Sequence, residues 1–269
     1  MDLPQFYANQ KKPCFGETLW AKIREEVLNE MQKDTILENF LHSTVLQHGS
    51  LQEVLAFYLS RKLANQVIQA EDLQEIFTEV LNKNPEIIQA AEADLNACYE
   101  RDPACLFLFM PVLHFKGYQA LQVHRMNHCL WEGSRYTLAH LLQNRMSEVF
   151  GVDIHPAARF GKGIMLDHGT GLVVGETAVL GDNISILHGV TLGGSGKEAD
   201  DRHPKIGNGV MIGANASILG NITIGNCARI GAGSVVLNPV PARSTVVGVP
   251  ARVIGTAEEN PAADMKQCL

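Results

Sequence analysis

The strongest pattern in the chain is a branched aliphatic residue at every sixth position of its C-terminal half. Six of these are consecutive and in register: Ile206, Ile212, Ile218, Ile224, Ile230 and Val236. The residue four positions after each is small or branched: Val210, Ala216, Ile222, Ala228, Ser234 and Val240. Neither a helix, with a period of 3.6, nor a strand, with a period of two, produces this pattern. A fixed six-residue period indicates a hexapeptide parallel β-helix, whose stacked coils bury the aliphatic side chains.

The same period extends upstream and is interrupted once. Four aliphatic residues are in phase with one another: Val174, Leu180, Ile186 and Leu192. Phe160 and Leu166 form a shorter run that is two residues out of phase with them. After Leu192 the repeat breaks, and the inserted residues are rich in glycine and charged side chains. A solenoid expels an insertion as a loop on one face, often the binding face, so we expect a loop over residues 193–204.

The N-terminal half has the periodicity of amphipathic helices. Ser50 and Glu53 have the three-residue spacing of a capping box. They introduce a stripe with i, i+3, i+4 spacing, which consists of Leu51, Val54, Leu55, Tyr58 and Leu59. A preceding helix is predicted from Ile36, Leu37, Phe40, Leu41 and Val45. We interpret these stripes as hydrophobic core.

Prolines mark the limits of a later helix. Pro85 is suited to a first helical turn, where its missing N–H does no harm. Pro103 follows Asp102, and the residue before a proline avoids the α region, so the helix should end there. Further helices are predicted over about residues 117–131 and 135–150.

The composition changes sharply near Gly151, where glycine and branched aliphatics replace Leu, Gln and Glu. The predicted fold class is therefore α+β and multidomain. Residues 1–150 form an all-α domain, and residues 151–255 form the β-helix with its extruded loop. Residues 256–269 are polar and non-periodic, which predicts a flexible tail.

Composition narrows the classes of function. The net charge of −7 over 269 residues argues against a nucleic-acid partner. The first twelve residues are polar and do not resemble a secretion signal, and no run of about 18 apolar residues predicts a membrane span. The six cysteines are Cys14, Cys98, Cys105, Cys129, Cys227 and Cys268. None has CxxC spacing, so we expect free thiols in a cytoplasmic protein and no covalent acyl-cysteine mechanism.

Four histidines lie in the predicted β-helix, at positions 155, 168, 188 and 203. No two are close in sequence, as a β-helix metal site would need, so we expect no metal. Asp153 and His168 are fifteen residues apart, and a coil of three hexapeptides takes about eighteen, so we expect them on neighbouring coils. A carboxylate there could orient the imidazole as a general base for a hydroxyl nucleophile. Both residue types also suit β-helix turns, and spacing alone leaves the choice open.

Two further groups are candidates for ligand binding. Arg202 and His203 lie where the expelled loop returns, and an Arg–His pair could bind a substrate carboxylate. A solvated charged loop is the alternative. The glycines at 193, 194 and 196 beside Lys197 could admit a phosphate or pantetheine, although their spacing matches neither a P-loop nor a dinucleotide fingerprint.

Several motifs together resemble the bacterial serine acetyltransferase family. They are RDPA at 101–104, FKG at 115–117, QALQ at 119–122, DIHPAA at 153–158, GIMLDH at 163–168, VVGETAV at 173–179, VTLGGSGK at 190–197, DRHPKI at 201–206, GAGSVV at 231–236 and GVPAR at 248–252. The hexapeptides alone indicate only an acyltransferase superfamily. The helical half with RDPA, together with the DIHPAA, MLDH and DRHPKI stretches, is much more specific, and the resemblance covers about residues 18–255.

The resemblance implies a left-handed β-helix that packs into trimers, two of which join through their helical domains. It implies transfer of acetyl from acetyl-CoA to L-serine by direct attack of the hydroxyl, with L-cysteine as an inhibitor in the serine site. By the family pattern His168 is the base and Asp153 its partner. The resemblance assigns the substrate ammonium to Asp102 and Asp167, and the carboxylate to Arg202 and His203.

Acetyl-CoA is implied to lie in the groove between adjacent β-helices, near Gly193, Gly194, Ala214 and Ala232. The family's C-terminus commonly ends in Ile and binds O-acetylserine sulfhydrylase, whereas this chain ends in Leu269. Two alternatives remain: an acyltransferase for another hydroxyl compound, and a non-catalytic scaffold for the sulfhydrylase.

Overall fold

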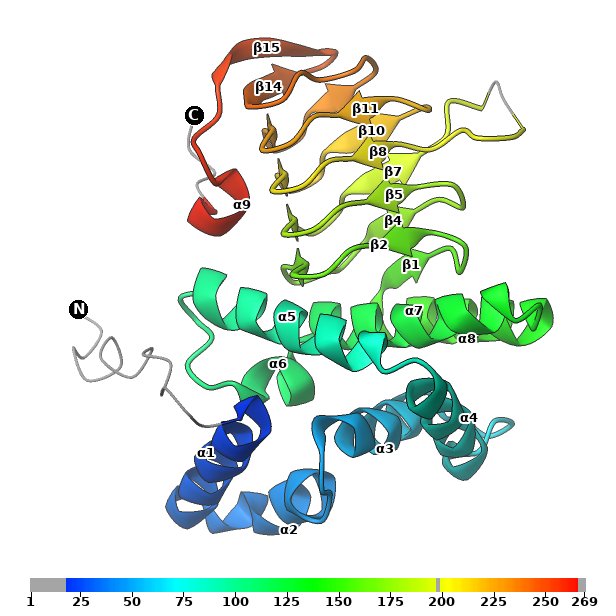
Figure 1. The fold of residues 1–269 in the computed structure, drawn as a ribbon, viewed down its shortest axis with the longest axis vertical. Helices are drawn as coiled ribbons and strands as arrows, with labels where there is room; N and C mark the ends of the chain where they lie inside the picture. Colours follow the sequence, from blue (N-terminus) through cyan, green and yellow to red (C-terminus); the bar gives the residue numbers. More distant parts are fainter. Residues whose placement is uncertain (1–17, 197–198, 266–269) are drawn as a thin grey trace.

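The computed structural model describes residues 18–196 and 199–265. Helices occupy one end of the molecule, and a stack of β coils rises from them (Figure 1). The two parts meet where α8 (Tyr136–Phe150) ends and β1 (Val152–Ile154) begins. Between them Gly151 has a φ of 66°, a left-handed conformation that suits glycine and reverses the chain. The prediction of a helical domain followed by a parallel β-helix is confirmed.

The helices before α8 follow most of the predicted boundaries. They are α1 (Leu19–Lys33), η1 (Thr35–Leu37), α2 (Glu38–Leu41), η2 (His42–Leu46), α3 (Leu51–Leu63), α4 (Ala70–Lys83), α5 (Glu86–Arg101), α6 (Phe109–His114) and α7 (Lys116–Glu132). The Oγ of Ser50 accepts a hydrogen bond from the Glu53 amide at 3.2 Å, which confirms the predicted helix cap. The short helix α6 was not predicted.

Residues 34–46 depart from the single helix predicted there. The segment begins as a 3₁₀ turn, continues as one α turn and ends as a π turn. Leu41 and Val45 are buried as expected, whereas Ile36 is 83% exposed and Phe40 is 36% exposed. A change of helix type changes the number of residues per turn, so a constant 3.6-residue period does not describe which side chains turn inward.

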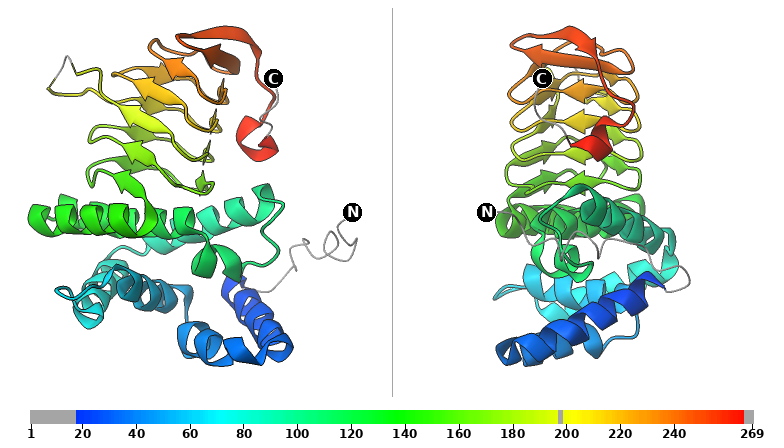
Figure 2. Two further views of the ribbon diagram at one scale, coloured as in Figure 1. Left: turned by 180° about the vertical axis from the view of Figure 1, so that it is seen from behind. Right: turned by 90° about the vertical axis from the view of Figure 1, so that its left-hand side faces the viewer.

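Successive coils of the β-helix contribute short strands to three sheets, or faces, in which all strands are parallel except the last strand of the third face (Figure 2). Face A consists of β1, β4 (Leu172–Val174), β7 (Thr191–Gly193), β10 (Ser217–Leu219) and β13 (Val235–Val236). Face B consists of β2 (Arg159–Phe160), β5 (Val179–Leu180), β8 (Lys205–Ile206) and β11 (Thr223–Ile224). Face C consists of β3 (Met165–Leu166), β6 (Ser185–Ile186), β9 (Met211–Ile212), β12 (Arg229–Ile230), β14 (Ser244–Gly248) and β15 (Ala251–Thr256).

Strand pairing explains the phase of the repeat. Ile206 pairs with Ile224, eighteen residues later, as three hexapeptides require. Phe160 pairs with Leu180, twenty residues later, so the first coil holds two extra residues and the early run is out of phase. Leu180 pairs with Ile206, because the inserted residues leave the coil as a loop. All six aliphatics of the main repeat are buried.

The turns of successive coils stack into three corners, which we name by the faces that they join. The A/B corner contains residues 155–158, 175–178 and the inserted loop 194–204. The C/A corner contains residues 167–171, 187–190, 213–216 and 231–234. The B/C corner contains residues 161–164, 181–184, 207–210 and 225–228. Residues at the same corner therefore lie close together, whereas residues at different corners lie apart.

A buried ion pair joins the helices to the first coil. Asp94 of α5 accepts hydrogen bonds from the Nε and Nη2 of Arg125 of α7, at 2.9 and 2.7 Å. Its other oxygen accepts from the Ile164 amide at 2.8 Å, and Arg125 donates to the Gly161 carbonyl at 2.7 Å. Burial raises the pKa of Asp94, while the guanidinium opposes that rise. These four bonds fix the orientation of two helices against the β-helix.

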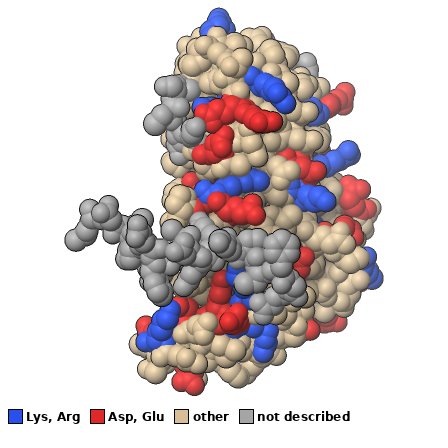
Figure 3. Space-filling model, turned by 60° about the vertical axis from the view of Figure 1, so that its left-hand side comes forward, with Lys and Arg blue, Asp and Glu red and all other residues tan. Residues whose placement is uncertain are grey.

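The tail departs from the flexible segment that was predicted from residue 256. Strand β15 ends at Thr256, and α9 (Pro261–Asp264) then packs against the coils. The Oγ of Ser185 on face C donates to the carbonyl of Ala262, which is fully buried, at 2.8 Å. Figure 3 shows this side of the molecule, where acidic and basic side chains are interspersed. The terminal Leu269 lies outside the described residues.

Within residues 18–196 and 199–265, no helix has the length and apolar character needed to cross a bilayer.

Candidate active site

One group of predicted site residues gathers where the helices meet the C/A corner. Asp102 follows the last residue of α5, and Asp167 and His168 follow β3. All three line a cavity of about 410 Å³ between α5, α6, α7 and the first coil. The two carboxylates predicted to hold an ammonium group thus share one cavity with the predicted base. We call Asp102, Asp167 and His168 the acidic cluster.

Gly117 makes this approach of helix and coil possible. A Cβ added at Gly117 would lie 2.0 Å from the carbonyl oxygen of Leu166, so only glycine fits there. Gly169 lies on the other side of the same contact, where its own Cβ would be 3.1 Å from the Gly117 Cα. The FKG stretch therefore has a structural role that the sequence alone did not reveal, which is to place α7 directly on the turn that carries His168.

The environment of the acidic cluster suits binding of a cation. Burial raises the pKa of Asp167; the charge of His168 opposes the rise, and the nearby Asp102 carboxylate adds to it. An ammonium group placed between the two carboxylates would relieve their repulsion. His168 has a φ of 57°, uncommon for a residue other than glycine. Its side chain is 72% exposed, with Nε2 3.7 Å from Asp167 Oδ1. The imidazole is thus accessible to a substrate at the mouth of the cavity.

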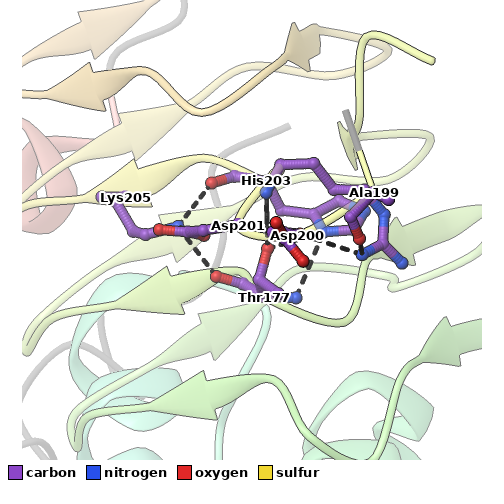
Figure 4. A network of polar contacts seen from close by, with 7 residues as sticks. Thr177, Ala199, Asp200, Asp201, His203 and Lys205 are labelled. Carbon is purple, nitrogen blue, oxygen red and sulfur yellow. Dashed lines mark hydrogen bonds and ion pairs between the residues drawn. The ribbon is translucent and has the colours of Figure 1, made fainter. Parts of the chain in front are cut away.

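A second group lies at the A/B corner and contains Arg202 and His203. The Oγ1 of Thr177 accepts hydrogen bonds from the backbone amides of both residues, each at 3.1 Å (Figure 4). The Arg202 side chain donates to the carbonyls of Ala199 and Asp200 at 2.8 and 3.1 Å, and to Glu176 at 2.6 Å. The loop return is therefore an ordered network. We call Arg202 and His203 the basic pair.

His203 is held in one ring orientation. Its Nδ1 accepts a hydrogen bond from the Thr177 amide at 3.1 Å, which in the neutral ring leaves the proton on Nε2. A Cβ on Gly175 would lie 2.0 Å from Nε2 and Cδ2, so glycine at this position makes room for the ring. Burial lowers the pKa of His203, as does the neighbouring Arg202 charge. The ring is thus preorganised to donate a hydrogen bond, as a carboxylate would require.

Asp153 lies on face A, and its position corrects one sequence expectation. Asp153 pairs with Val173 of the next coil. His168 is only fifteen residues after Asp153, short of the twenty that this coil takes, so the two residues lie on the same coil and not on neighbouring ones. The Asp153 carboxylate accepts a hydrogen bond from Nε2 of Gln143 at 2.7 Å. The Asp153–His168 pair stays a prediction.

The predicted acetyl-CoA residues divide between two corners. Gly193 ends β7 and Gly194 begins the inserted loop at the A/B corner, where Gly193 O accepts from the Gly220 amide at 2.9 Å. Ala214 and Ala232 lie in stacked turns of the C/A corner, above His168. Lys197 is outside the described residues. A groove lined by all four would need the two corners to face each other.

Several residues of these clusters were missed by the sequence reasoning. Gly175, Glu176 and Thr177 belong to the VVGETAV stretch, which marked the resemblance but received no role. Gln143 lies in α8 and carries no motif. A glycine directly before two polar residues at a repeat turn was the available signal for the His203 cradle. Gln143 offered none, since its contact arises only when α8 folds back on β1.

No group of three His, Cys, Asp or Glu side chains is placed to hold a metal ion in the part of the chain that the structure describes.

Comparison with known proteins relates this geometry to a family. Residues 19–123 match the family described as serine acetyltransferase, N-terminal, and residues 203–238 match bacterial transferase hexapeptide (six repeats). The structure is similar to that of Neisseria gonorrhoeae serine acetyltransferase in complex with serine, with a TM-score of 0.86 and 60% identity over 88% of this chain and 98% of that one. The chain belongs to the serine acetyltransferase family. The expectation from the motifs is thereby confirmed.

Two further solved serine acetyltransferases contain other ligands. The enzyme from Brucella abortus strain S19 in complex with coenzyme A has a TM-score of 0.88 and 49% identity, covering 90% of this chain and 97% of that one. A serine acetyltransferase in complex with cysteine has a TM-score of 0.92 and 50% identity, covering 93% and 98%.

Proposed function

We propose that this member of the serine acetyltransferase family transfers acetyl from acetyl-CoA to the hydroxyl of L-serine, giving O-acetyl-L-serine and CoA in the first step of cysteine biosynthesis. One observation carries the proposal: His168 stands at the mouth of a cavity that also holds Asp102 and Asp167. Two carboxylates beside a base suit an amino acid whose ammonium group must be held while its hydroxyl reacts. A neutral sugar acceptor would need no such pair.

The chemistry follows from the position of the imidazole. His168 removes the hydroxyl proton as the serine oxygen attacks the thioester carbonyl carbon, which becomes tetrahedral. The C–S bond then breaks, the proton passes from the imidazolium to the leaving thiolate, and no acyl-enzyme forms. Asp153 stabilises the imidazolium. Backbone N–H groups in the glycine-rich stretch at Gly193 and Gly194 stabilise the oxyanion.

The basic pair completes the site from a second copy of the chain. Within one chain it lies at the A/B corner, while the acidic cluster lies at the C/A corner. A serine molecule is too small to span the two corners of one coil stack. A cyclic trimer that places the A/B corner of one copy against the C/A corner of the next unites them, together with the four acetyl-CoA residues.

Two trimers then join through their helical ends. Leu28, Ile36, Leu37 and Phe40 expose apolar surface there, at 47%, 83%, 40% and 36% of their areas. A cluster of large exposed apolar side chains on a soluble protein marks an interaction surface. A dimer of trimers buries it. Sedimentation that gives six copies for the wild type and three for Ile36→Glu would support this, and an unchanged state would contradict it.

L-cysteine is proposed as an inhibitor in the serine site, because it keeps the ammonium and carboxylate of serine. The cysteine complex of a 50% identical relative supports this. An increase of the serine KM with cysteine, at constant kcat, is expected, and cysteine at millimolar levels that leaves the rate unchanged would contradict it.

We place the reaction in the cytoplasm, where acetyl-CoA and reduced thiols occur.

The direct test measures CoA release from acetyl-CoA with L-serine, for the wild type and for His168→Ala. A serine-dependent signal that falls about 10²-fold or more in the variant is expected. A folded wild type with no serine-dependent signal would overturn the assigned acceptor, and homoserine and sugars would then be compared as substrates. Full activity in the variant would keep the reaction and move the base to another residue.

Mixed oligomers test the shared site. His168→Ala and His203→Ala chains are each expected to be strongly impaired as pure oligomers when they are assayed with serine well below its KM. Co-refolded at equal amounts, they should regain about a quarter of the wild-type sites, because some interfaces then combine two intact corners. If each chain holds a complete site, the mixture stays inactive.

Binding of O-acetylserine sulfhydrylase through the tail is tested by deletion of Leu269, which should abolish it.

A further inference from the structure

Asp153 has one hydrogen-bond partner whose role no motif suggested. Gln143 of α8 donates from Nε2 to Asp153 Oδ1 at 2.7 Å, the distance of a strong amide–carboxylate hydrogen bond. The same amide meets a second polar group, since its Oε1 lies 3.1 Å from Nδ1 of His140. His140 and Gln143 are three residues apart and share one helix face. The three side chains form a continuous row that ends at the predicted partner of the base.

This row follows from the way in which the chain turns between α8 and β1. The helix ends at Phe150, Gly151 turns the chain, and β1 returns along the helix that has just ended. Gln143 lies two turns before the end of α8, and Asp153 is the central residue of β1. Both side chains are half-buried, so the bond is partly shielded from water.

The orientation of the amide decides what Gln143 does. A glutamine side chain offers a carbonyl oxygen and an NH₂ group, and a carboxylate requires the NH₂. With its proton on Nδ1, His140 donates to Oε1 and holds the NH₂ toward Asp153. Donation to one oxygen of Asp153 holds the carboxylate in one orientation and leaves its other oxygen for an imidazolium.

The other groups that face this row come from three elements. The His140 ring packs at right angles to Trp131 of α7, with centroids 5.4 Å apart, and to His155 after β1, at 5.5 Å. Burial lowers the pKa of His155; Glu176 of the A/B corner opposes this, whereas Arg202 and His203 add to it. Asp153 and its row thus lie on the side of the β-helix that carries the basic pair.

We propose that Gln143, oriented by His140, is a positioning residue that holds the Asp153 carboxylate in the orientation it needs as the partner of His168 in the assembled enzyme. The proposal rests on the proposed function, because it acts through Asp153. The competing role is purely structural, in which the bond only fastens α8 to β1. A structural role lowers the thermal midpoint with little change in kcat, whereas a positioning role lowers kcat at nearly constant KM.

The test compares Gln143→Ala and Gln143→Glu with Asn144→Ala. Asn144 is a matched control on the same helix, since its amide donates to Glu148 at 2.7 Å and does not meet Asp153. We measure kcat, both KM values and the thermal midpoint. Gln143→Glu is nearly isosteric, so it remains informative if Gln143→Ala folds poorly.

Gln143→Ala is expected to lower kcat about ten- to a hundred-fold, as loss of a hydrogen bond to a charged group does, with both KM values nearly unchanged. Gln143→Glu replaces the donor with a carboxylate that cannot donate and that repels Asp153, so its kcat should fall at least as far. Asn144→Ala should change neither kcat nor KM. Unchanged kcat in both Gln143 variants would overturn the proposal.

The double variant Gln143→Ala with Asp153→Asn separates this proposal from the proposed function. If Gln143 acts through Asp153, adding Gln143→Ala to Asp153→Asn has almost no further effect on kcat. A full additional loss would refute the coupling and leave the serine acetyltransferase reaction in place. A wild-type rate in Asp153→Asn would refute both the partner role of Asp153 and the role of Gln143. Absence of serine-dependent turnover in the wild type would instead refute the proposed function.

Discussion

The acidic cluster and the basic pair are built in different ways. The acidic cluster takes Asp102 from the helical domain and His168 from the first coil, so its geometry depends on how two domains meet. The basic pair lies within the β-helix, where Thr177 of the preceding coil holds the loop return. The contact of α5 and α7 with the first coil is called the joint below. A site between domains is sensitive to the geometry of this joint, whereas a site within stacked coils is sensitive to the conformation of local turns. The following substitutions separate these two dependences.

The largest expected effect comes from the ion pair in the joint. Asp94→Asn leaves the Arg125 guanidinium buried with a neutral partner, and loss of a buried charge partner costs about 3–5 kcal/mol of unfolding free energy. Urea unfolding at pH 7 measures it. Glu79→Gln removes an exposed ion pair with Lys83 and should leave stability unchanged. Equal stability of Asp94→Asn and wild type would mean that this pair does not fix the joint.

Gly117→Ala attacks the joint by crowding. The new Cβ would lie 2.0 Å from the Leu166 oxygen, so α7 and β3 must separate. We expect a loss of about 1–3 kcal/mol, typical of overpacking, together with a lower kcat because the turn of His168 moves. Gly133→Ala is the control, since its Cβ would lie 3.3 Å from its closest neighbour, at a helix end. A stable and fully active Gly117→Ala variant would show that the contact is loose.

Gly175→Ala should disturb the basic pair and leave the joint intact. Its Cβ would lie 2.0 Å from the His203 ring, which must leave its position beside Thr177. Loss of a charge-assisted contact to the serine carboxylate predicts a serine KM about ten-fold higher, with the thermal midpoint nearly unchanged. Gly255→Ala has open space around its Cβ and serves as control. An unchanged serine KM would exclude His203 from the carboxylate site.

The smallest effect concerns a group outside both clusters. Burial raises the pKa of Glu26 from 4.5 to about 7. Protonation is favoured in the folded state, so this contribution to stability is complete below pH 4.5 and is lost as pH rises through 7. Glu26→Gln should therefore gain about 1 kcal/mol relative to wild type at pH 8 and nothing at pH 4, after allowance for partial solvent screening. Thermal unfolding at both pH values measures it, and equal gains would contradict the titration.

The sequence predicted the β-helix better than the site, for physical reasons. A six-residue period is a local pattern, and the six aliphatic residues of the repeat, from Ile206 to Val236, are buried as that pattern requires. The placement of Asp153 and His168 on neighbouring coils was wrong, because fifteen residues fall short of a full coil, which takes twenty residues here and eighteen in the regular repeat. The cavity around His168 depends on a close contact at Gly117, which no periodicity encodes. The motifs predicted residues for the site but gave no sign that they divide between two corners of one chain.

The antiparallel strand β15 has a consequence for the whole assembly. A stack of equal coils is a one-dimensional array, and its open end offers unpaired strand edges to any other chain. Here β15 folds back on β14 and pairs with it in the antiparallel direction, so it is the last strand of face C. A further coil could not continue the parallel pairing of the stack on this strand. Helices α5 and α7 close the other end. Association of copies along the coil axis is therefore disfavoured, which suits the side-by-side packing of the proposed trimer.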